Sequence, residues 1–233
     1  MQRDGNAGTT NNLMILKRTI LLFAFIFSGF LGFSQNIQYY VNAVASNSDV
    51  YIESVELVVN GTRFQIDLDG QLNFNNRRSN VTYYGQFDSE YKQGKVKSVN
   101  GVTLDYYDQF SSTDYSGKLR SIGGNTISYY DSFTIFVKKG LVKTIGNINI
   151  EYYDRFSGED KDGKVKSVGS VNVAYFDRFD GDERKGKMRS AGNTQITYFD
   201  RFDRNHAPGI IRSITGTTPR LRIYDMYDDV LIN

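Results

Sequence analysis

One stretch of this sequence reads Gly163-Lys-Val-Lys-Ser-Val-Gly-Ser-Val-Asn-Val-Ala-Tyr-Phe-Asp-Arg-Phe179. It contains two runs in which apolar and polar residues alternate, a pattern typical of half-buried β-strands. The dipeptide Gly169-Ser170 separates the runs and suits a tight turn. The stretch therefore predicts one β-hairpin, and residues 180–185 form a polar loop that leads to the next glycine.

The same hairpin is repeated along the chain at a fixed spacing. Each copy starts 23 residues after the last, at Gly94, Gly117, Gly140, Gly163 and Gly186, and a degraded copy starts at Gly209. A fixed period of this length indicates a repeat architecture in which each unit packs mainly on its neighbours. We therefore predict an all-β fold, built as an elongated antiparallel meander or solenoid-like sheet of tandem 23-residue β-hairpin repeats.

The remaining segments of the mature chain are predicted to flank these repeats. Asn60-Gly61 lies between two alternating runs, which is a strong hairpin signal, so we predict an N-terminal capping hairpin at 35–69. The tandem repeats occupy 70–208, beginning with a divergent copy at 70–87. In 209–233 Pro219 interrupts the pattern, and we predict a degraded repeat that forms the C-terminal cap.

The N-terminus has the features of a signal peptide. Lys17-Arg18 precede an apolar run at 20–33, and the small residues Gly32 and Ser34 suit a cleavage site after Ser34. We predict a signal peptide at 1–34, with Met14 as an alternative true start. The apolar run is short for a bilayer, so no stable membrane span is expected after cleavage. The protein is expected to be exported, to the periplasm, the outer surface or the extracellular space.

The composition bounds the partners of the mature chain. Residues 1–34 contain three of the 28 Lys and Arg and one of the 26 Asp and Glu, which leaves 25 of each sign. A chain without net positive charge is a poor candidate for nucleic-acid binding, so no nucleic-acid partner is expected. The 17 Tyr and 16 Phe favour β-sheet, and the absence of cysteine means that no disulfide supports the fold.

Alternation along the longer strand of each copy sorts its residues into two faces. One face is predicted to be buried and to carry an aliphatic column, a tyrosine column, an aspartate column and a phenylalanine column. The tyrosines are Tyr106, Tyr129, Tyr152, Tyr175 and Tyr198, and the phenylalanines are Phe110, Phe133, Phe156, Phe179 and Phe202. We therefore expect Tyr152 and Phe156 to be core residues alike.

The opposite face is predicted to be wetter and carries a second aromatic column together with basic residues. It is our candidate ligand surface, and its residues are Tyr107, Tyr130, Tyr153, Phe176, Phe199, Arg155, Arg178 and Arg201. The structural alternative is aromatic packing between strands. A basic column on the shorter strand is expected to pair with the acidic residues Asp105 and Glu151.

Residues for catalysis or metal binding are scarce. His206 is the only histidine and there is no cysteine, so the sequence offers almost no side chains for a zinc site or a nucleophile–histidine pair. The acidic loops at 158–163 and 180–183 could suit calcium, but the equivalent loop at 134–139 does not match them. We predict no catalytic, cofactor-binding or metal-binding residues, no cofactor, and a protein that is not an enzyme.

Two families of β-hairpin repeats resemble this sequence over about 70–227. Tyr106-Tyr-Asp-Gln-Phe110 and Gly94-Lys-Val-Lys-Ser-Val99 resemble YD (Rhs-type) repeats, and Tyr84-Gly-Gln-Phe87 with the 23-residue period is similar to MORN repeats. Both resemblances imply hairpin arrays that act as shells, scaffolds or interaction surfaces, and neither implies a catalytic residue. The later copies have Asp where the MORN core has Gly. The ending Phe33-Ser34-Gln35 resembles that of signal peptides of Bacteroidetes secreted proteins.

These observations favour a non-enzymatic exported repeat protein that serves as a scaffold or protein-interaction surface of the cell envelope. Its partner is expected to be an unknown protein or glycan of the envelope. Two alternatives stay open: a carbohydrate-binding module that uses the exposed aromatic column, and an outer-membrane β-barrel. The barrel is less favoured because Asp recurs on the apolar face, whereas lipid-facing bands carry no charge.

Overall fold

A computed structural model describes residues 37–74, 78–134, 137–227 and 231. The predicted signal peptide at 1–34, with the alternative start Met14, lies outside these residues. The described chain is all-β, as predicted, apart from one 3₁₀ turn at Arg155–Ser157. Within it, no helix combines the length and the apolar character needed to cross a membrane.

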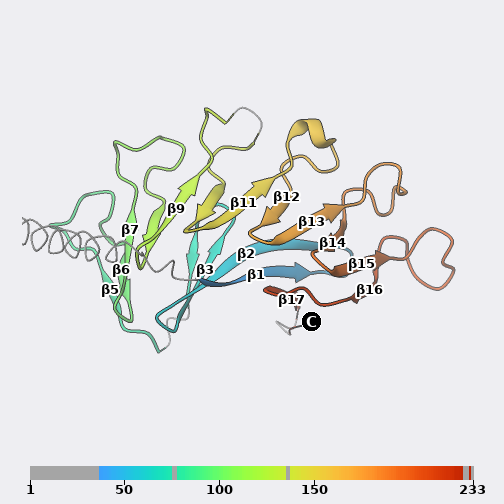
Figure 1. Cartoon of the computed structure of the whole chain (residues 1–233), viewed down its shortest axis with the longest axis horizontal. Helices are drawn as coiled ribbons and strands as arrows, with labels where there is room; N and C mark the ends of the chain where they lie inside the picture. Colours follow the sequence, from blue (N-terminus) through green and yellow to red (C-terminus); the bar gives the residue numbers. More distant parts are fainter. Residues whose placement is uncertain (1–36, 75–77, 135–136, 228–230, 232–233) are drawn as a thin grey trace, which may run out of the picture. The chain divides into compact units, whose positions relative to one another are not determined.

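The repeats form one long antiparallel meander, which confirms the predicted architecture (Figure 1). Each copy contributes a short strand and a longer strand, and consecutive strands pair. The sheet is open, with β5 and β16 at its two edges. Its 12 described strands are β5 (Val81–Tyr83), β6 (Val96–Val99), β7 (Val102–Tyr106), β8 (Leu119–Ile122), β9 (Asn125–Tyr129), β10 (Val142–Ile145), β11 (Ile148–Tyr152), β12 (Val165–Val168), β13 (Val171–Tyr175), β14 (Met188–Ala191), β15 (Thr194–Tyr198) and β16 (Ile211–Thr215).

Two-residue turns close the hairpins at the predicted positions. Val168 pairs with Val171 across Gly169-Ser170, and only the glycine has positive φ, at 55°. In the copy with Asn100-Gly101 both φ values are positive, at 51° and 80°. These are the patterns of type II′ and type I′ turns, whose backbone twist matches that of paired strands. The turn dipeptides thus fix the register inside each hairpin.

Between hairpins, every junction contains a β-bulge at the same place. Asp105 pairs with Ser121 and Tyr106 pairs with Leu119, so Arg120 is the extra residue on its strand. The basic column predicted for the wetter face occupies this bulge throughout, and a bulge increases the local twist of a sheet. The bulge residues are Lys97, Arg120, Lys143, Lys166, Arg189 and Arg212.

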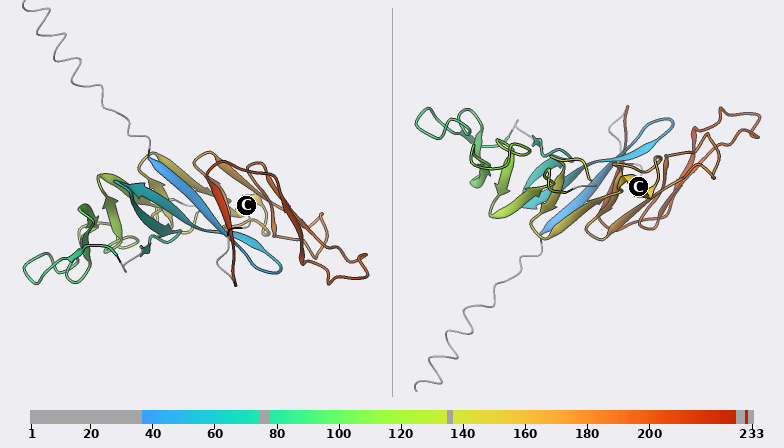
Figure 2. Two further views of the ribbon diagram at one scale, coloured as in Figure 1. Left: turned by 90° about the horizontal axis from the view of Figure 1, so that it is seen from below. Right: turned by 90° about the horizontal axis from the view of Figure 1, so that it is seen from above.

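A second, five-stranded sheet lies against one face of the meander (Figures 1 and 2). The predicted hairpin at Asn60-Gly61 forms its centre. The C-terminal strand joins it by pairing in parallel with the first strand, from Val41 opposite Leu221 to Ala45 opposite Asp225. Its strands, in spatial order, are β17 (Leu221–Asp225), β1 (Gln38–Ala45), β2 (Val50–Val59), β3 (Thr62–Asp67) and β4 (Leu72–Asn73).

This second layer corrects three segment predictions. Residues 35–69 were expected to cap one end of the array, but β1–β3 cover its face. In the divergent copy at 70–87, β4 belongs to the second sheet and only β5 to the meander. Residues 209–233 divide between the sheets, with β16 in one and β17 in the other. The reason is burial: the aliphatic face of a sheet must pack against another layer.

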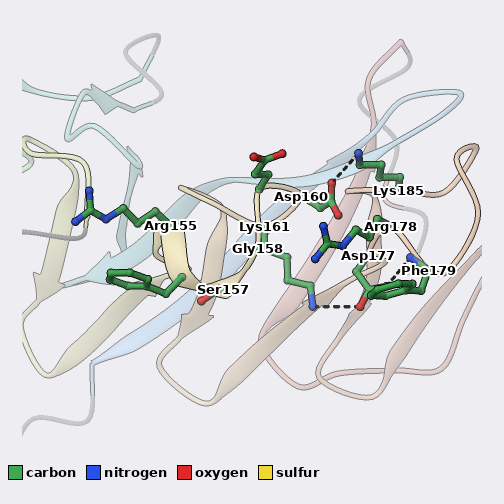
Figure 3. A pocket seen from close by; sticks show the side chains of 11 residues that line it. Arg155, Ser157, Gly158, Asp160, Lys161, Asp177, Arg178, Phe179 and Lys185 are labelled. Carbon is green, nitrogen blue, oxygen red and sulfur yellow. Dashed lines mark hydrogen bonds and ion pairs between the residues drawn. The ribbon is translucent and has the colours of Figure 1, made fainter.

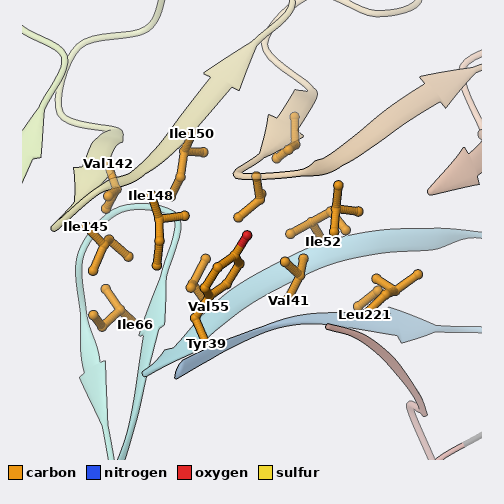
Figure 4. Packing of buried hydrophobic residues seen from close by; sticks show 14 of the residues in the cluster. Tyr39, Val41, Ile52, Val55, Ile66, Val142, Ile145, Ile148, Ile150 and Leu221 are labelled. Carbon is orange, nitrogen blue, oxygen red and sulfur yellow. The ribbon is translucent and has the colours of Figure 1, made fainter. Parts of the chain in front are cut away.

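The core lies between the two sheets (Figure 4). Val41 and Val55 of the second sheet face Ile148 and Ile150 of the meander. The aliphatic and tyrosine columns are buried here, as predicted. Each buried tyrosine hydroxyl needs an acceptor, and that of Tyr152 donates to the Val142 carbonyl at 3.2 Å. Equivalent bonds join Tyr129 to Leu119 and Tyr198 to Met188.

Four turn glycines of successive repeats contact four different residues of the second layer. A methyl group added to any of these glycines would overlap its neighbour. At the third of these contacts the Ser170 amide also donates to the Tyr39 hydroxyl at 3.4 Å. The repeats are therefore docked individually to fixed positions along the second layer. The contacts are Gly123 with Val59, Gly146 with Ile37, Gly169 with Tyr39, and Gly192 with Thr218.

A carboxyl pair at the end of β3 makes stability depend on pH. Burial, together with the neighbouring Asp69, raises the pKa of Asp67 to about 6, against 3.8 for an ordinary aspartate. The folded state then binds more protons than the unfolded state at about pH 4–6. Stability contributed by this group is therefore lost as pH rises through that window. Asp67→Asn should remove this loss, because an amide does not titrate in this range. The change should not break the turn, because the amide oxygen can still accept from the Gln71 amide.

The measurement is the urea midpoint of wild type and Asp67→Asn at steps between pH 4 and pH 7. Asp203→Asn is the control of opposite sign, because hydrogen bonds from the Asn205 and His206 amides lower the pKa of Asp203. Its stabilisation is lost only as pH falls below the ordinary aspartate value of 3.8, so this control is followed down to about pH 2. Parallel pH profiles for wild type and Asp67→Asn would contradict the prediction.

Candidate functional site

The Asp-X-Phe residues of each copy leave the strand and form a turn. The Asp108 carboxylate accepts from the Phe110 amide at 3.1 Å and from the amide and hydroxyl of Ser111 at 3.1 and 3.0 Å. Asp154 does the same for Phe156 and Ser157. This is an Asx turn, in which the aspartate carboxylate accepts hydrogen bonds from backbone amides two and three residues later, which would otherwise bond to a neighbouring strand. Strand alternation therefore ends at the preceding tyrosines.

The consequence is that the phenylalanine column is exposed, which corrects its predicted burial. The side chains of this column are 71–87% exposed, whereas the tyrosines four residues earlier are buried, and Phe87 of the divergent copy is 96% exposed. The loops that carry them project away from β1 and β17 (Figure 1). We call this set the phenylalanine row: Phe87, Phe110, Phe133, Phe156, Phe179 and Phe202.

Guanidinium groups accompany the row in its last three copies. Arg155, Arg178 and Arg201 each lie over the ring that follows in sequence, 5.2–5.3 Å from its centroid. A cation over an aromatic face is an attractive contact, and here it also keeps a positive charge beside an exposed ring. These arginines were predicted to accompany the second aromatic column, but the structure places them on the phenylalanine row.

A cleft of about 380 Å³ lies between two successive loops of the row (Figure 3). Phe179 and Arg178 line one side and Arg155 the other. Two ion pairs cross it, Lys161 to Asp177 at 3.9 Å and Lys185 to Asp160 at 3.3 Å. The cleft thus offers aromatic edges and side chains of both charges, a lining suited to binding.

The second aromatic column of the candidate ligand surface makes contacts within the fold. The hydroxyl of Tyr107 donates to the Ile127 carbonyl at 2.8 Å, that of Tyr130 to Ile150 at 3.0 Å, and that of Tyr153 to Val173 at 3.0 Å. Each bond joins one repeat to the next. Phe176 is buried, and the half-buried Phe199 stacks on His206 at a centroid distance of 4.0 Å.

The bulge residues cover this column from outside. Arg120 lies over Tyr107, Lys143 over Tyr130, and Arg189 over Phe176, at 5.2–5.9 Å from the ring centroids. The expected ion pairs are also present, Arg120 to Asp105 at 3.5 Å and Lys166 to Glu151 at 3.3 Å. The column and the basic residues share one face, as predicted, and their mutual contacts leave less aromatic surface for a ligand than the phenylalanine row does.

Acidic and histidine side chains are dispersed over the described residues. No group of three or more among them lies close enough to hold a metal ion. His206 is exposed, and its Nδ1 lies 3.1 Å from the Asp203 carboxylate.

The phenylalanine row had a local signal that sequence reasoning missed. A hydroxyl or carboxylate residue follows each aspartate at the third position, as in Asp108 with Ser111 and Asp131 with Thr134. That pattern is typical of an Asx turn. No protein-family model, no curated protein and no solved structure matches this chain.

Proposed function

We propose that this is a non-enzymatic, exported repeat protein that serves as an interaction scaffold of the cell envelope, with the phenylalanine row as its contact surface. The observation that carries the proposal is the exposure of six equivalent phenylalanines. A single exposed apolar residue needs no explanation, but a regular series of them is typical of an interaction site.

The geometry of the row suits a partner with repeated binding elements. Successive rings are separated by one hairpin, and a hairpin advances a sheet by about 9–10 Å. Each ring offers a modest contact, but rings on one scaffold act together, so that their combined avidity exceeds that of one contact. In the copies with the aspartate, the Asx turn holds the loop backbone through the carboxylate, and the rings of the row stay 71–96% exposed.

An expected result distinguishes binding from folding. The triple variant Phe87→Ser, Phe110→Ser, Phe133→Ser should change the free energy of unfolding by less than about 0.5 kcal/mol per site, because these rings are exposed. Its binding to envelope fractions should fall by at least about tenfold. The matched control is Gln86→Ala, Gln109→Ala, Ser132→Ala, which changes the residue before each ring. Equal binding by the two triples would contradict the proposal.

A carbohydrate partner is the second candidate, favoured by the arginine–phenylalanine pairs. Arg178 and Arg201 lie over exposed rings and make no ion pair with a described acidic residue. Such a pair can stack on a sugar ring and pair with a carboxylate of an acidic polysaccharide. Pull-down with neutral and acidic polysaccharides tests this candidate. Retention on acidic chains that Arg178→Gln, Arg201→Gln abolishes would favour it over a protein partner.

A further inference from the structure

We propose that the second sheet carries a separate binding site, for a ligand with a primary ammonium group. A cleft of about 370 Å³ lies on the side of this sheet that faces away from the core. It is lined by residues of β1, β2, β3 and β17 and the residue after β17. Those that carry the argument are Asn42, Tyr51, Glu53, Gln65, Tyr224 and Asp225. The proposal goes beyond the phenylalanine row, which belongs to the meander.

The floor of the cleft contains a buried amide with an unmet hydrogen bond. Asn42 is 4% exposed, although its neighbours Val41 and Ala43 face the core on the other side of β1. Its Nδ2 donates to the Ser54 hydroxyl at 3.3 Å, but its Oδ1 has no partner. A buried amide oxygen without a donor is unfavourable, and in folded proteins such an atom is rare. It therefore points to a ligand that supplies the donor.

A β-bulge places a carboxylate beside this amide. Ser54 pairs with Asn42 and Ile52 pairs with Ala43, so Glu53 is the extra residue on β2. Ile52 and Val55 are both buried in the core, and two residues lie between them instead of one. The inward–outward alternation of side chains is therefore interrupted at the bulge, and the side chains of Glu53 and Ser54 both face outward. Bulges of this kind often re-aim side chains at binding sites.

The cleft holds two carboxylates without a paired cation. Glu53 accepts from the Gln65 amide at 3.3 Å, and Asp225 accepts from the Tyr227 backbone amide at 2.8 Å. Neither forms an ion pair with a described residue. The third carboxylate, Glu56, differs, because Arg63 and Arg222 lie 2.8 and 2.9 Å from it. Charge complementarity therefore favours a cationic ligand.

A primary ammonium group can satisfy both the unpaired amide oxygen and the two carboxylates. An ammonium group has three N–H donors for the Asn42 Oδ1 and the two carboxylates, and its charge is attracted to the faces of Tyr51 and Tyr224. A neutral sugar could supply donors but would leave both negative charges uncompensated. The ligand class is therefore a primary amine, such as a lysine side chain.

The test titrates the full chain with n-pentylamine and, separately, with 1-pentanol, which has the same chain length without the charge. Proton–nitrogen NMR reports on the side-chain amides of Asn42 and Gln65. We expect saturable shifts of both amides with pentylamine only, and weaker binding at higher salt. Equal shifts with pentanol, or no shift with either compound, would overturn the proposal.

Variants locate the site. Glu53→Gln and Asp225→Asn should each weaken pentylamine binding by about tenfold, because each removes a charge-assisted contact. Glu53 is exposed and Asp225 is half-buried, so the fold should survive either change, which circular dichroism checks. Glu159→Gln, the same chemical change in an exposed loop of the phenylalanine row, should leave the affinity within about twofold of wild type. Unchanged affinity in both cleft variants would overturn the proposal.

Discussion

Tyr152→Ala should lower the free energy of unfolding by about 3–5 kcal/mol, whereas Phe156→Ala should change it by less than about 0.5 kcal/mol. The two residues lie four apart in the same copy. Tyr152 is 6% exposed, lies edge-on to Tyr130 at a centroid distance of 5.7 Å, and bonds to the Val142 carbonyl. Phe156 is 71% exposed, because the Asx turn at Asp154 directs it out of the sheet.

Chemical denaturation of both variants measures the contrast. Tyr152→Phe is the matched control, since it keeps the ring and removes only the hydroxyl, and it should cost about 1 kcal/mol. Tyr153→Ala should fall between the two alanine variants, because Tyr153 is half-buried and bonds to Val173. A larger loss for Phe156→Ala than for Tyr152→Ala would show that the face assignment is inverted.

Deletion of one complete repeat, residues 140–162, should destabilise the protein by about 5 kcal/mol or more, which is of the order of a domain's whole stability. In a simple array, each repeat contacts only its neighbours, and removal of one leaves the others in place. Here the turn glycines of successive repeats dock against different residues of the second layer. After deletion, the turn at Gly169 can no longer meet Tyr39 while Gly123 meets Val59.

Duplication of residues 140–162 further distinguishes a simple repeat array from repeats that are docked on a second sheet. A simple array gains stability with each added repeat. The two-layer arrangement predicts a loss, because the second sheet has a fixed width and its contacts with the last repeats, such as the Ile211 amide to the Asn47 carbonyl at 2.9 Å, would be displaced. Urea denaturation of both length variants measures this. A duplicated chain that unfolds at higher urea than wild type would contradict the prediction.

The hairpins could be predicted because their signals are local. The apolar–polar alternation and the turn dipeptides, such as Gly169-Ser170, act within about ten residues, and the 23-residue period repeats each signal. Burial of Tyr152 with its column followed from the same alternation. The phenylalanine row was misplaced because the alternation was extended through Asp154, where the aspartate side chain ends the strand.

The sequence by itself therefore determined the repeat, the turns, the meander and the buried tyrosine column, all of which depend on neighbouring residues. Only the tertiary structure decided that the N-terminal strands cover the face of the meander and that β17 pairs with β1. It also decided that Asn42, Glu53 and Asp225 meet in one cleft. These contacts join segments far apart in the chain, and they form because one sheet alone cannot bury its apolar face.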